Sequence, residues 1–350
     1  MGEPAKWSRG KLEAVPNCPA CGSAARRPLV LTRHDDGGVM PDLWSMHACA
    51  SCGSIYLDPR PDPESLPRAY ADYYTHQAES EDVPDRGGAG LGWRLIHGYL
   101  NWRFGMHRQP ANGFGRLVFT LIEPWRLKLD YYGRHLTRNR RVYRGRLLDI
   151  GCGNGAFLAR ARDMGWQVVG CEPDREAIMT CRALGLDVRA GDAFMPDLDN
   201  ERFDVITLSH VIEHVHNPVA LLARVYGLLR PGGLLWLATP NPASLGLRVY
   251  GAAWRGLHMP YHLCIPSQPV LMHWLEGVGF VHPRLVRRGA HARNQWRDSR
   301  AIARREGLPV PGAVTYRLTR TATDVAAALS PRRAEETVLM ARKLADRHDR

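Results

Sequence analysis

Two short pairs of cysteines near the start of the chain have a spacing that suits metal ligation. They are Cys18-Pro-Ala-Cys21 and Cys49-Ala-Ser-Cys52, each followed by glycine, and 27 residues separate them. The pattern predicts a closed, structural zinc site with four thiolate ligands, Cys18, Cys21, Cys49 and Cys52. The residues between the pairs would form a hairpin that turns at residues 35–38. A pair of disulfides or a redox dithiol is the alternative that the pattern leaves open.

A glycine-rich stretch in the middle of the chain has the residue types of a nucleotide-binding turn. It reads Leu-Asp-Ile-Gly-Cys-Gly-Asn-Gly over residues 148–155, and its glycines allow a sharp turn close to a ligand. Glu172, 21 residues after Gly151, is placed to accept hydrogen bonds from both ribose hydroxyls. Asp149 suits a ligand that carries an ammonium group, and Asp192 could reach an adenine amino group. An NAD-dependent oxidoreductase stays open, because the turn also satisfies the dinucleotide fingerprint.

Acid–base residues are concentrated at two further places. His210, Glu213 and His214 follow an expected strand, and on a helix they would share one face. Histidine suits a general base because its pKa lies near neutrality, so we expect His214 to be the base; in the structural alternative Glu213 only braces the helix. The second cluster would line an acceptor pocket or form an ordered aromatic loop, and its members are Trp254, His258, Tyr261 and His262.

From residue 146 onward the hydrophobic pattern alternates between strand and helix. This predicts an α/β fold with a doubly wound, mainly parallel sheet. Strands are expected at residues 146–150, 167–172, 187–192, 203–210, 234–239, 281–288 and 336–342. Helices are expected up to residue 164 and at residues 174–184, 219–230 and 269–277, with residues 231–233 as a tight turn. The candidate residues would then meet at the carboxyl edge of the sheet, where such folds bind ligands.

At these motifs the chain resembles class I S-adenosylmethionine-dependent methyltransferases, over residues 145–288 and at the strand 336–342. The resemblance implies a seven-stranded Rossmann-like methyltransferase sheet whose last strand is antiparallel. It also implies S-adenosylmethionine as cofactor, with the glycines and Asp149 at its methionine end, Glu172 at its ribose and Asp192 at its adenine. The implied cofactor-binding residues are Asp149, Gly151, Cys152, Gly153, Gly155, Glu172, Pro173, Asp192, Ala193 and Ser209.

Two narrower resemblances concern the acid–base segment and the cysteines. Ubiquinone-pathway O-methyltransferases carry Glu-x-x-Glu-His where this chain has His210, Glu213 and His214, so His210 replaces the first glutamate. A His-Glu-His face could still bind a divalent metal. The cysteine pairs and the following Asp-Pro-Arg-Pro resemble the start of bacterial methyltransferases that carry an N-terminal zinc ribbon.

Composition indicates a globular chain of about two domains, with 350 residues, 45% of them hydrophobic and 23% charged. We divide it into a small zinc ribbon at 15–60, a helical connector or lid at 61–144 and a methyltransferase domain at 145–345. A short helix is expected at 64–75 and a linker at 77–90. No apolar run reaches the ~18 residues of a membrane span and no signal peptide is evident, so a cytoplasmic protein is expected.

The net charge of +12 is concentrated in two blocks, residues 86–146 with +11 and residues 287–350 with +8. Within the first block, residues 91–141 interleave aromatic and basic side chains. This predicts either peripheral contact with the inner face of a membrane or a helical lid on the next domain. Residues 1–85 carry a net charge of −5, so the ribbon is a poor reader of nucleic-acid phosphates.

Together these features predict methyl transfer to an oxygen or carbon of a small-molecule, sugar or lipid-linked acceptor. The expected catalytic residues are His214, Glu213, His210 and His262. Two alternatives stay open: an RNA methyltransferase with an N-terminal zinc ribbon, and a non-catalytic scaffold that binds S-adenosylmethionine.

Overall fold

The computed structural model describes residues 7–34, 42–70, 90–136 and 145–345. The expected hairpin turn at 35–38 and nearly all of the expected linker at 77–90 lie outside these residues. The helix expected at 64–75 is described only in its first part, where α1 (Leu66–Ala69) is a single turn.

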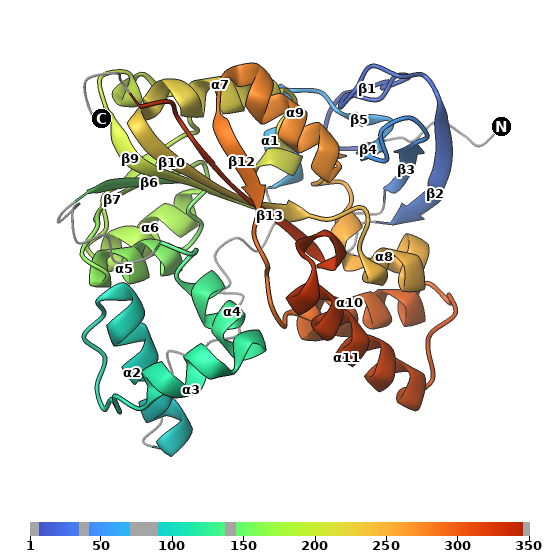
Figure 1. Cartoon of the computed structure of the whole chain (residues 1–350). Helices are drawn as coiled ribbons and strands as arrows, with labels where there is room; N and C mark the ends of the chain where they lie inside the picture. The colour runs from blue at the N-terminus through green and yellow to red at the C-terminus, as the bar shows by residue number, and fades with distance from the viewer. Residues whose placement is uncertain (1–6, 35–41, 71–89, 137–144, 346–350) are drawn as a thin grey trace.

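A seven-stranded sheet forms the centre of the molecule (Figure 1). Its order is β12 (Val281–Leu285), β13 (Glu336–Arg342), β10 (Leu229–Pro240), β9 (Phe203–Ser209), β6 (Arg146–Ile150), β7 (Gln167–Glu172) and β8 (Val188–Ala190). β13 is antiparallel to both of its neighbours, whereas the other adjacent pairs are parallel. The α/β Rossmann-like methyltransferase sheet expected from the sequence is confirmed, including its antiparallel last strand.

Four helices cover the two faces of this sheet. α7 (Pro218–Leu228) and α9 (Gln268–Val278) lie on one face, and α5 (Ala156–Asp163) and α6 (Arg175–Ala183) lie on the other (Figure 1). The expected tight turn at residues 231–233 is wrong: these residues belong to β10, whose register against β9 shifts between Leu229 and Leu234. Gly232 accommodates the irregularity with a φ of 74°.

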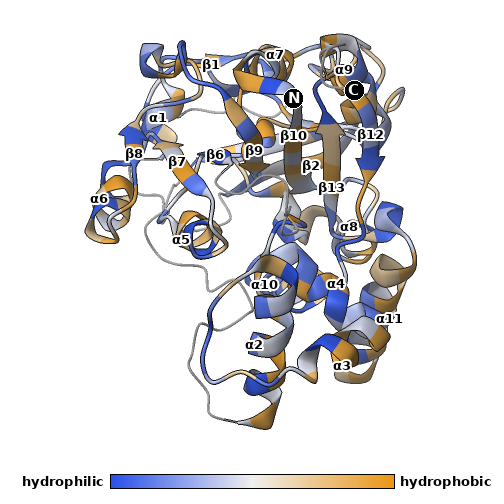
Figure 2. Cartoon of the chain, turned by 60° about the vertical axis from the view of Figure 1, so that its left-hand side comes forward, coloured by the Kyte–Doolittle hydropathy of each residue, from blue (hydrophilic) through white to orange (hydrophobic). Residues whose placement is uncertain are grey.

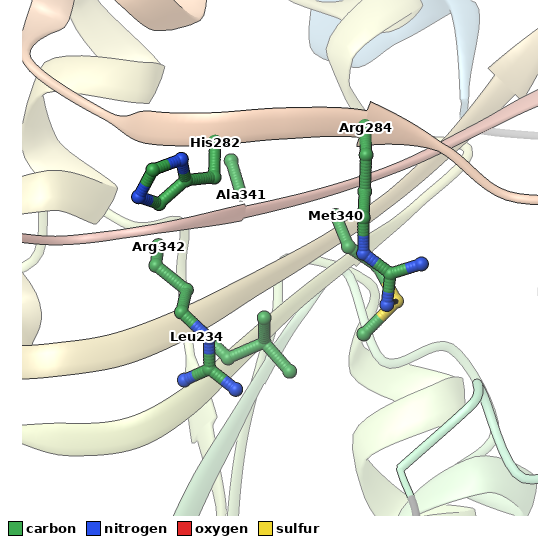
Figure 3. A pocket seen from close by; sticks show the side chains of 6 residues that line it. All are labelled: Leu234, His282, Arg284, Met340, Ala341 and Arg342. Carbon is green, nitrogen blue, oxygen red and sulfur yellow. Dashed lines mark hydrogen bonds between the residues drawn. The ribbon is translucent and has the colours of Figure 1, made fainter.

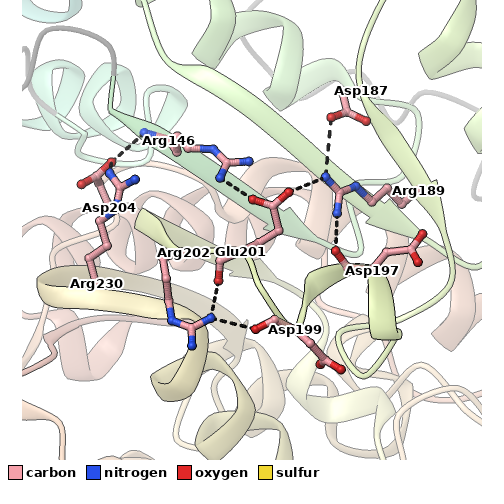
Figure 4. A network of polar contacts seen from close by, with 9 residues as sticks. All are labelled: Arg146, Asp187, Arg189, Asp197, Asp199, Glu201, Arg202, Asp204 and Arg230. Atoms are coloured by element: carbon pink, nitrogen blue, oxygen red, sulfur yellow. Dashed lines mark hydrogen bonds and ion pairs between the residues drawn. The ribbon is translucent and has the colours of Figure 1, made fainter.

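A polar network fixes the amino ends of the central strands (Figure 4). Glu201 pairs with Arg146 at the start of β6 and with Arg189 of β8, and these guanidinium groups lower the pKa of Glu201 to about 2. Asp204 of β9 accepts hydrogen bonds from the Arg146 amide at 2.7 Å and from Arg230 at 2.8 Å. These contacts hold the amino ends of the strands in place and so help to position their carboxyl ends on the opposite side of the sheet.

The cysteine-rich segment forms a second sheet that includes a strand from far along the chain. Its order is β11 (Cys264–Ile265), β4 (Ile55–Leu57), β3 (Leu43–Cys49) and β2 (Arg26–His34), while β1 (Leu12–Glu13) pairs with β5 (Arg60–Pro61). Trp44 of β3 shares one hydrophobic core with Trp254 and Trp296. The division into three domains stays a prediction, but the ribbon and the later part of the chain share both a sheet and a core.

Further helices lie on the side of the sheet that carries α5 and α6 or beside the ribbon. They are α2 (Leu91–Phe104), α3 (Gly115–Leu121), α4 (Glu123–Tyr132), α8 (Leu245–Tyr250), α10 (Ala292–Arg305) and α11 (Ala313–Leu329). α2, α3 and α4 have a core of their own that contains Tyr99, Leu100, Phe104 and Phe119. Within the described ranges, none of the helices combines the length and the apolar composition needed to cross a bilayer.

Candidate functional site

The glycine-rich turn joins β6 to α5 at the carboxyl edge of the sheet. Gly151, Gly153 and Gly155 have φ values of 66°, 54° and 77°, which disfavour any side chain. A Cβ atom on Gly151 would lie 2.7 Å from Val211, and one on Gly155 would lie 2.7 Å from Cys181. A Cβ atom on Gly153 would meet nothing within 4 Å, so the turn leaves open space for a ligand at Gly153.

Glu172 ends β7 beside this turn and is buried. Its Oε2 accepts a hydrogen bond from the Gly153 amide at 2.8 Å, and its Oε1 accepts one from the Asp174 amide at 3.1 Å. Burial raises the pKa of Glu172, while the two amides act in the opposite direction. Each oxygen keeps a second lone pair, so the carboxylate can still accept hydrogen bonds from hydroxyl groups.

The other residues expected at the cofactor differ in their surroundings. Asp192 and Pro173 are exposed, Ala193 is buried, and Ser209 is half-buried at the end of β9. Cys152 is buried in a hydrophobic cluster on the α5 side of the sheet, so its backbone rather than its thiol is at the turn.

Asp149 has a cationic partner inside the protein. Its carboxylate is fully buried, pairs with Arg134 and accepts a hydrogen bond from Thr207 Oγ1 at 2.6 Å. The Arg134 guanidinium also lies 3.6 Å from the centre of the Phe157 ring. No sequence pattern pointed to Arg134, and its guanidinium occupies the carboxylate that was expected to face the ammonium group of a ligand.

The acid–base segment after β9 is not the helix expected from the sequence. A single 3-10 turn spans Ile212–His214, and His210 precedes it with a φ of 54°. The three residues therefore do not share one face. Glu213 is fully buried, with Oε1 3.1 Å from His210 Nδ1 and Oε2 accepting from Thr239 Oγ1 at 2.9 Å.

His210 lies between two carboxylates. Glu336 of β13 has its Oε1 3.4 Å from His210 Nε2, and its Oε2 accepts from Arg288 Nε at 2.7 Å. Burial by itself would lower the pKa of His210, but the hydrogen bonds to Glu213 and Glu336 raise it to about 10. Burial likewise opposes the ionised form of Glu213, yet its contact with His210 lowers the pKa of Glu213 to about 2. His210 is therefore a cation at neutral pH and fixes Glu213.

His214 and His262 face each other on the other side of Glu213. Their ring centres are 4.7 Å apart, and His214 Nδ1 lies 2.8 Å from Tyr70 Oη and 3.0 Å from the Tyr261 carbonyl. Burial lowers the pKa of His214 and holds that of His262 well below its usual value, so both rings are neutral. His262 Nδ1 donates to the Gly256 carbonyl at 2.9 Å, which leaves the lone pair on Nε2, 3.9 Å from Glu213 Oε1.

This geometry changes the set of residues that could hold a divalent cation. The ligand atoms of Glu213, His214 and His262 lie within 4.8 Å of one another. The face of His210, Glu213 and His214 expected from the sequence is replaced by this trio, because His210 is engaged by two carboxylates.

The second expected cluster comes together only in part. The His258 ring lies 4.9 Å from that of Tyr261 and 5.1 Å from that of His262, and Tyr70 lies 5.3 Å from Tyr261. Trp254 shares with Tyr261 the core that also contains Trp44, and its indole donates to Glu335 at 2.9 Å, as the Trp296 indole does at 3.0 Å. No sequence pattern pointed to four residues of the site, which are Tyr70, Thr239, Arg288 and Glu336.

The four cysteines of the ribbon lie together. Cys18 Sγ is 3.7 Å from Cys52 Sγ, Cys21 Sγ is 3.6 Å from Cys49 Sγ, and all four lie within 4.8 Å of one another. Zinc–sulfur bonds of about 2.3 Å in a tetrahedron require sulfur–sulfur distances of about 3.8 Å. The four thiols therefore fit the metal that their spacing predicts.

The ribbon is joined to the loop that carries His262. The Leu57 amide donates to the Leu263 carbonyl at 3.0 Å, and the Leu263 amide donates to the Glu213 carbonyl at 2.8 Å. Ser54 lies two residues after Cys52, and its Oγ accepts a hydrogen bond from the Ser267 amide at 2.9 Å. The backbone thus connects the cysteine cluster directly to the acid–base residues.

A pocket of about 160 Å³ lies at the opposite, amino edge of the parallel strands (Figure 3). Its lining residues are Leu234, His282, Arg284, Met340, Ala341 and Arg342. It contains none of the residues described above and is separate from the candidate site.

Comparison with known proteins identifies the central part of the chain. Residues 125–282 match the family described as a methyltransferase domain. Over 117 residues the chain is 36% identical to the ubiquinone biosynthesis O-methyltransferase of Cereibacter sphaeroides. This alignment covers 31% of this chain and 47% of that protein. It is 31% identical over 165 residues to the protein of the same name from Xanthomonas oryzae pv. oryzae, covering 43% of this chain and 66% of that protein.

The chain thus spans about half to two thirds of the length of these curated relatives. Among solved structures, a SAM-dependent methyltransferase from Archaeoglobus fulgidus aligns with a TM-score of 0.41 and 19% identity, over 64% of this chain and 94% of that one. Residues 125–282 are thus similar to a methyltransferase domain, and the strand order is that of the Rossmann-like methyltransferase sheet.

Proposed function

We propose that the protein transfers a methyl group from S-adenosylmethionine to an oxygen or carbon of a small-molecule acceptor, sugar-linked and lipid-linked molecules included. One observation carries the proposal. At the same sheet edge, an open glycine turn beside Glu172 stands next to a buried carboxylate flanked by two neutral histidines. The names of the relatives support O-methylation of a small molecule.

In this proposal Glu172 binds the ribose hydroxyls and Asp192 the adenine edge, while the glycine turn accommodates the methionine end. The cofactor supplies an activated methyl group, so the protein mainly aligns the acceptor with it. His262 Nε2, or His214, takes the proton of the acceptor hydroxyl as the carbon–oxygen bond forms and the carbon–sulfur bond breaks. Glu213 stabilises the resulting imidazolium.

The test is transfer of a radiolabelled methyl group from S-adenosylmethionine into fractionated lysate of the source organism. Label in the small-molecule, lipid or glycan fraction is the expected result. Label in RNA alone would overturn the proposal in favour of an RNA methyltransferase. No label in any fraction, with S-adenosylhomocysteine binding intact, would overturn it in favour of a scaffold.

We also propose that Cys18, Cys21, Cys49 and Cys52 bind a structural zinc ion. Support comes from the sulfur–sulfur distances and from Gly22 and Gly53, whose φ values of 76° and 75° give both knuckles the same turn. Elemental analysis of the purified protein should find one zinc per chain. Cys49→Ser should lose it, whereas Cys171→Ala, a change to a cysteine in β7, should keep it. Stoichiometric zinc in both variants would contradict the site.

A further inference from the structure

A row of apolar side chains on α3 and α4 faces solvent. Phe114 at the N-cap of α3, Leu117 and Leu121 recur at intervals of three and four residues, which places them along one side of α3. Trp125, in the first turn of α4, is also exposed. Leu121 is 74% exposed and Phe114 is 71% exposed. The opposite side of α3 supplies Phe119 to the small core with α2, and α4 supplies Leu129 to the same core. The segment thus has one apolar side that packs and another that does not.

α11 repeats this arrangement. Val314, Leu318, Val325 and Leu329 lie on one face of the helix, and Leu329 is 74% exposed. The buried side of α11 is made by small residues, Thr323, Ala327 and Ala328. The larger apolar side chains of α11 therefore point outward, the reverse of what a helix on the surface of a globular protein normally shows.

The two rows lie near each other. α4 contacts α11, and Arg287 joins them, because it donates to Glu123 of α4 at 2.7 Å and to the Ala328 carbonyl of α11 at 3.1 Å. Both α3 and α11 lie at the lower end of the molecule in two views related by rotation about the vertical axis (Figures 1 and 2). We call this surface, made by the two apolar rows, the lower face.

The charges around the lower face are positive. Residues 90–136 carry seven Lys or Arg side chains, of which Arg134 is buried against Asp149, and two carboxylates. Both carboxylates are engaged: Glu123 pairs with Arg126 and Arg287, and Asp130 with Arg103. Asp324, the one carboxylate of α11, accepts the backbone amides of His291 and Ala292, both at 2.9 Å. Among the described residues of these helices, the surface therefore offers cations, and each carboxylate is already engaged by arginines or backbone amides.

We propose that the lower face docks on an anionic lipid bilayer, with the apolar rows in the interfacial region and the arginines at the headgroups. Exposed tryptophan and phenylalanine beside arginine suit that region, as at Trp102, whose ring lies 4.9 Å from the Arg116 guanidinium carbon. A second copy of the chain fits less well, because a two-fold contact would set the same basic surface against itself. The inference does not depend on the chemistry proposed above.

The test is flotation of the full chain with vesicles of phosphatidylcholine alone or with 30% phosphatidylglycerol. We expect binding to the anionic vesicles that weakens as salt rises. The double variant Leu121→Glu/Leu318→Glu should bind at least about tenfold more weakly, because each change places a charge where an apolar side chain enters the lipid. Met179→Glu is the matched control, since Met179 is 68% exposed on α6, outside the lower face.

Circular dichroism and S-adenosylhomocysteine binding of the double variant should match those of the parent and so exclude misfolding. Equal binding to both vesicle types, no binding by the parent chain, or equal loss in the Met179→Glu control would overturn the proposal. A dimer in sedimentation that the double variant dissociates, without vesicle binding by the parent, would assign the lower face to a second copy instead.

Discussion

The two sides of the candidate site are assembled in different ways. On the cofactor side, the residues that meet at Gly153 come from consecutive strand–helix units between Asp149 and Ala193. On the acceptor side, Glu213 and its neighbours are gathered from the whole chain, with partners from α1, β9, β10, the loop before β11, the segment after β12 and β13. The comparison shows that a site can join a locally encoded half to one that only tertiary packing creates.

Loss of the ribbon metal should give the largest difference between the two sides, because it should disturb the acceptor side and leave cofactor affinity almost unchanged. Cys49→Ser, or removal of zinc by a chelator, should destabilise the ribbon by several kcal/mol and disturb the β4–β11 pairing that supports His262. S-adenosylhomocysteine affinity should stay within a few-fold, because the amides of the glycine turn donate to Cys171 and Glu172 of β7. Calorimetry on the zinc-depleted protein measures this. Loss of binding along with the metal would show that the two sides are not separable.

Glu213→Gln should be the most damaging single change on the acceptor side outside the ribbon. It leaves the His210 imidazolium without one of its two carboxylates and should lower the free energy of unfolding by about 2–3 kcal/mol. This is the low end for a broken buried pair, because 34% of the His210 side chain is exposed. Urea denaturation measures it. Thr239→Val, which removes only the hydroxyl bonded to Glu213, is the control and should cost about 1 kcal/mol.

A pair of variants tests whether Glu172 acts in cofactor binding and His262 in methyl transfer. Glu172→Ala should weaken S-adenosylhomocysteine binding by about 1.5–3 kcal/mol, the scale of hydrogen bonds to a charged group. His262→Gln should leave that affinity unchanged while methyl transfer falls, since the ring bonds the Gly256 carbonyl and faces Glu213, whereas Glu172 bonds the glycine turn. Titration calorimetry and the transfer assay give the two readouts. If Glu172→Ala bound as well as the parent, the cofactor assignment would be wrong.

The ion pairs of His210 with Glu213 and Glu336 should make the free energy of unfolding depend on pH. The folded pKa of His210, about 10, lies above its unfolded value, so its stabilising contribution is complete below about pH 6.5. That contribution declines as pH rises and is lost near pH 10. The free energy of unfolding of the parent relative to His210→Gln should therefore shrink over this range. A constant difference would show that His210 is neutral in the folded protein.

Tyr70→Phe should have the smallest effect of the series. It removes the hydroxyl that lies 2.8 Å from His214 Nδ1, a single hydrogen bond worth about 1 kcal/mol. Methyl transfer should fall several-fold, with S-adenosylhomocysteine affinity unchanged. A loss as large as that of His262→Gln would make Tyr70 part of the reacting centre.

The sequence was informative where structure is encoded locally. The strand at residues 336–342 and the glycine turn could be recognised because apolar runs and glycines carry their own signal. The helix expected at His210–His214 failed because the chain leaves β9 through a positive φ at His210 and makes only one 3-10 turn. Glu336 and Arg288 could not be assigned to His210, because they reach it only through the insertion of β13 between β10 and β12.

The two helices α10 and α11 were missed for a related reason. Their buried sides are made largely of alanine, serine and threonine, with Trp296 and Ile302 as the larger exceptions, so few large apolar side chains mark these buried sides in the sequence. Arg134 follows α4 in a segment whose composition predicted only a connector. Its role beside Asp149 depends on how α2–α4 pack against the sheet.

Glu335 and Glu336 are neighbours in the chain, yet they serve opposite sides of the molecule. The first holds two tryptophan indoles in the core shared with the ribbon, and the second holds His210 at the acceptor side. Side chains of an extended segment alternate, so insertion or deletion of one residue here would exchange the two carboxylates. The few residues before β13 therefore cannot change in length by one without disturbing both the core shared with the ribbon and the acceptor side.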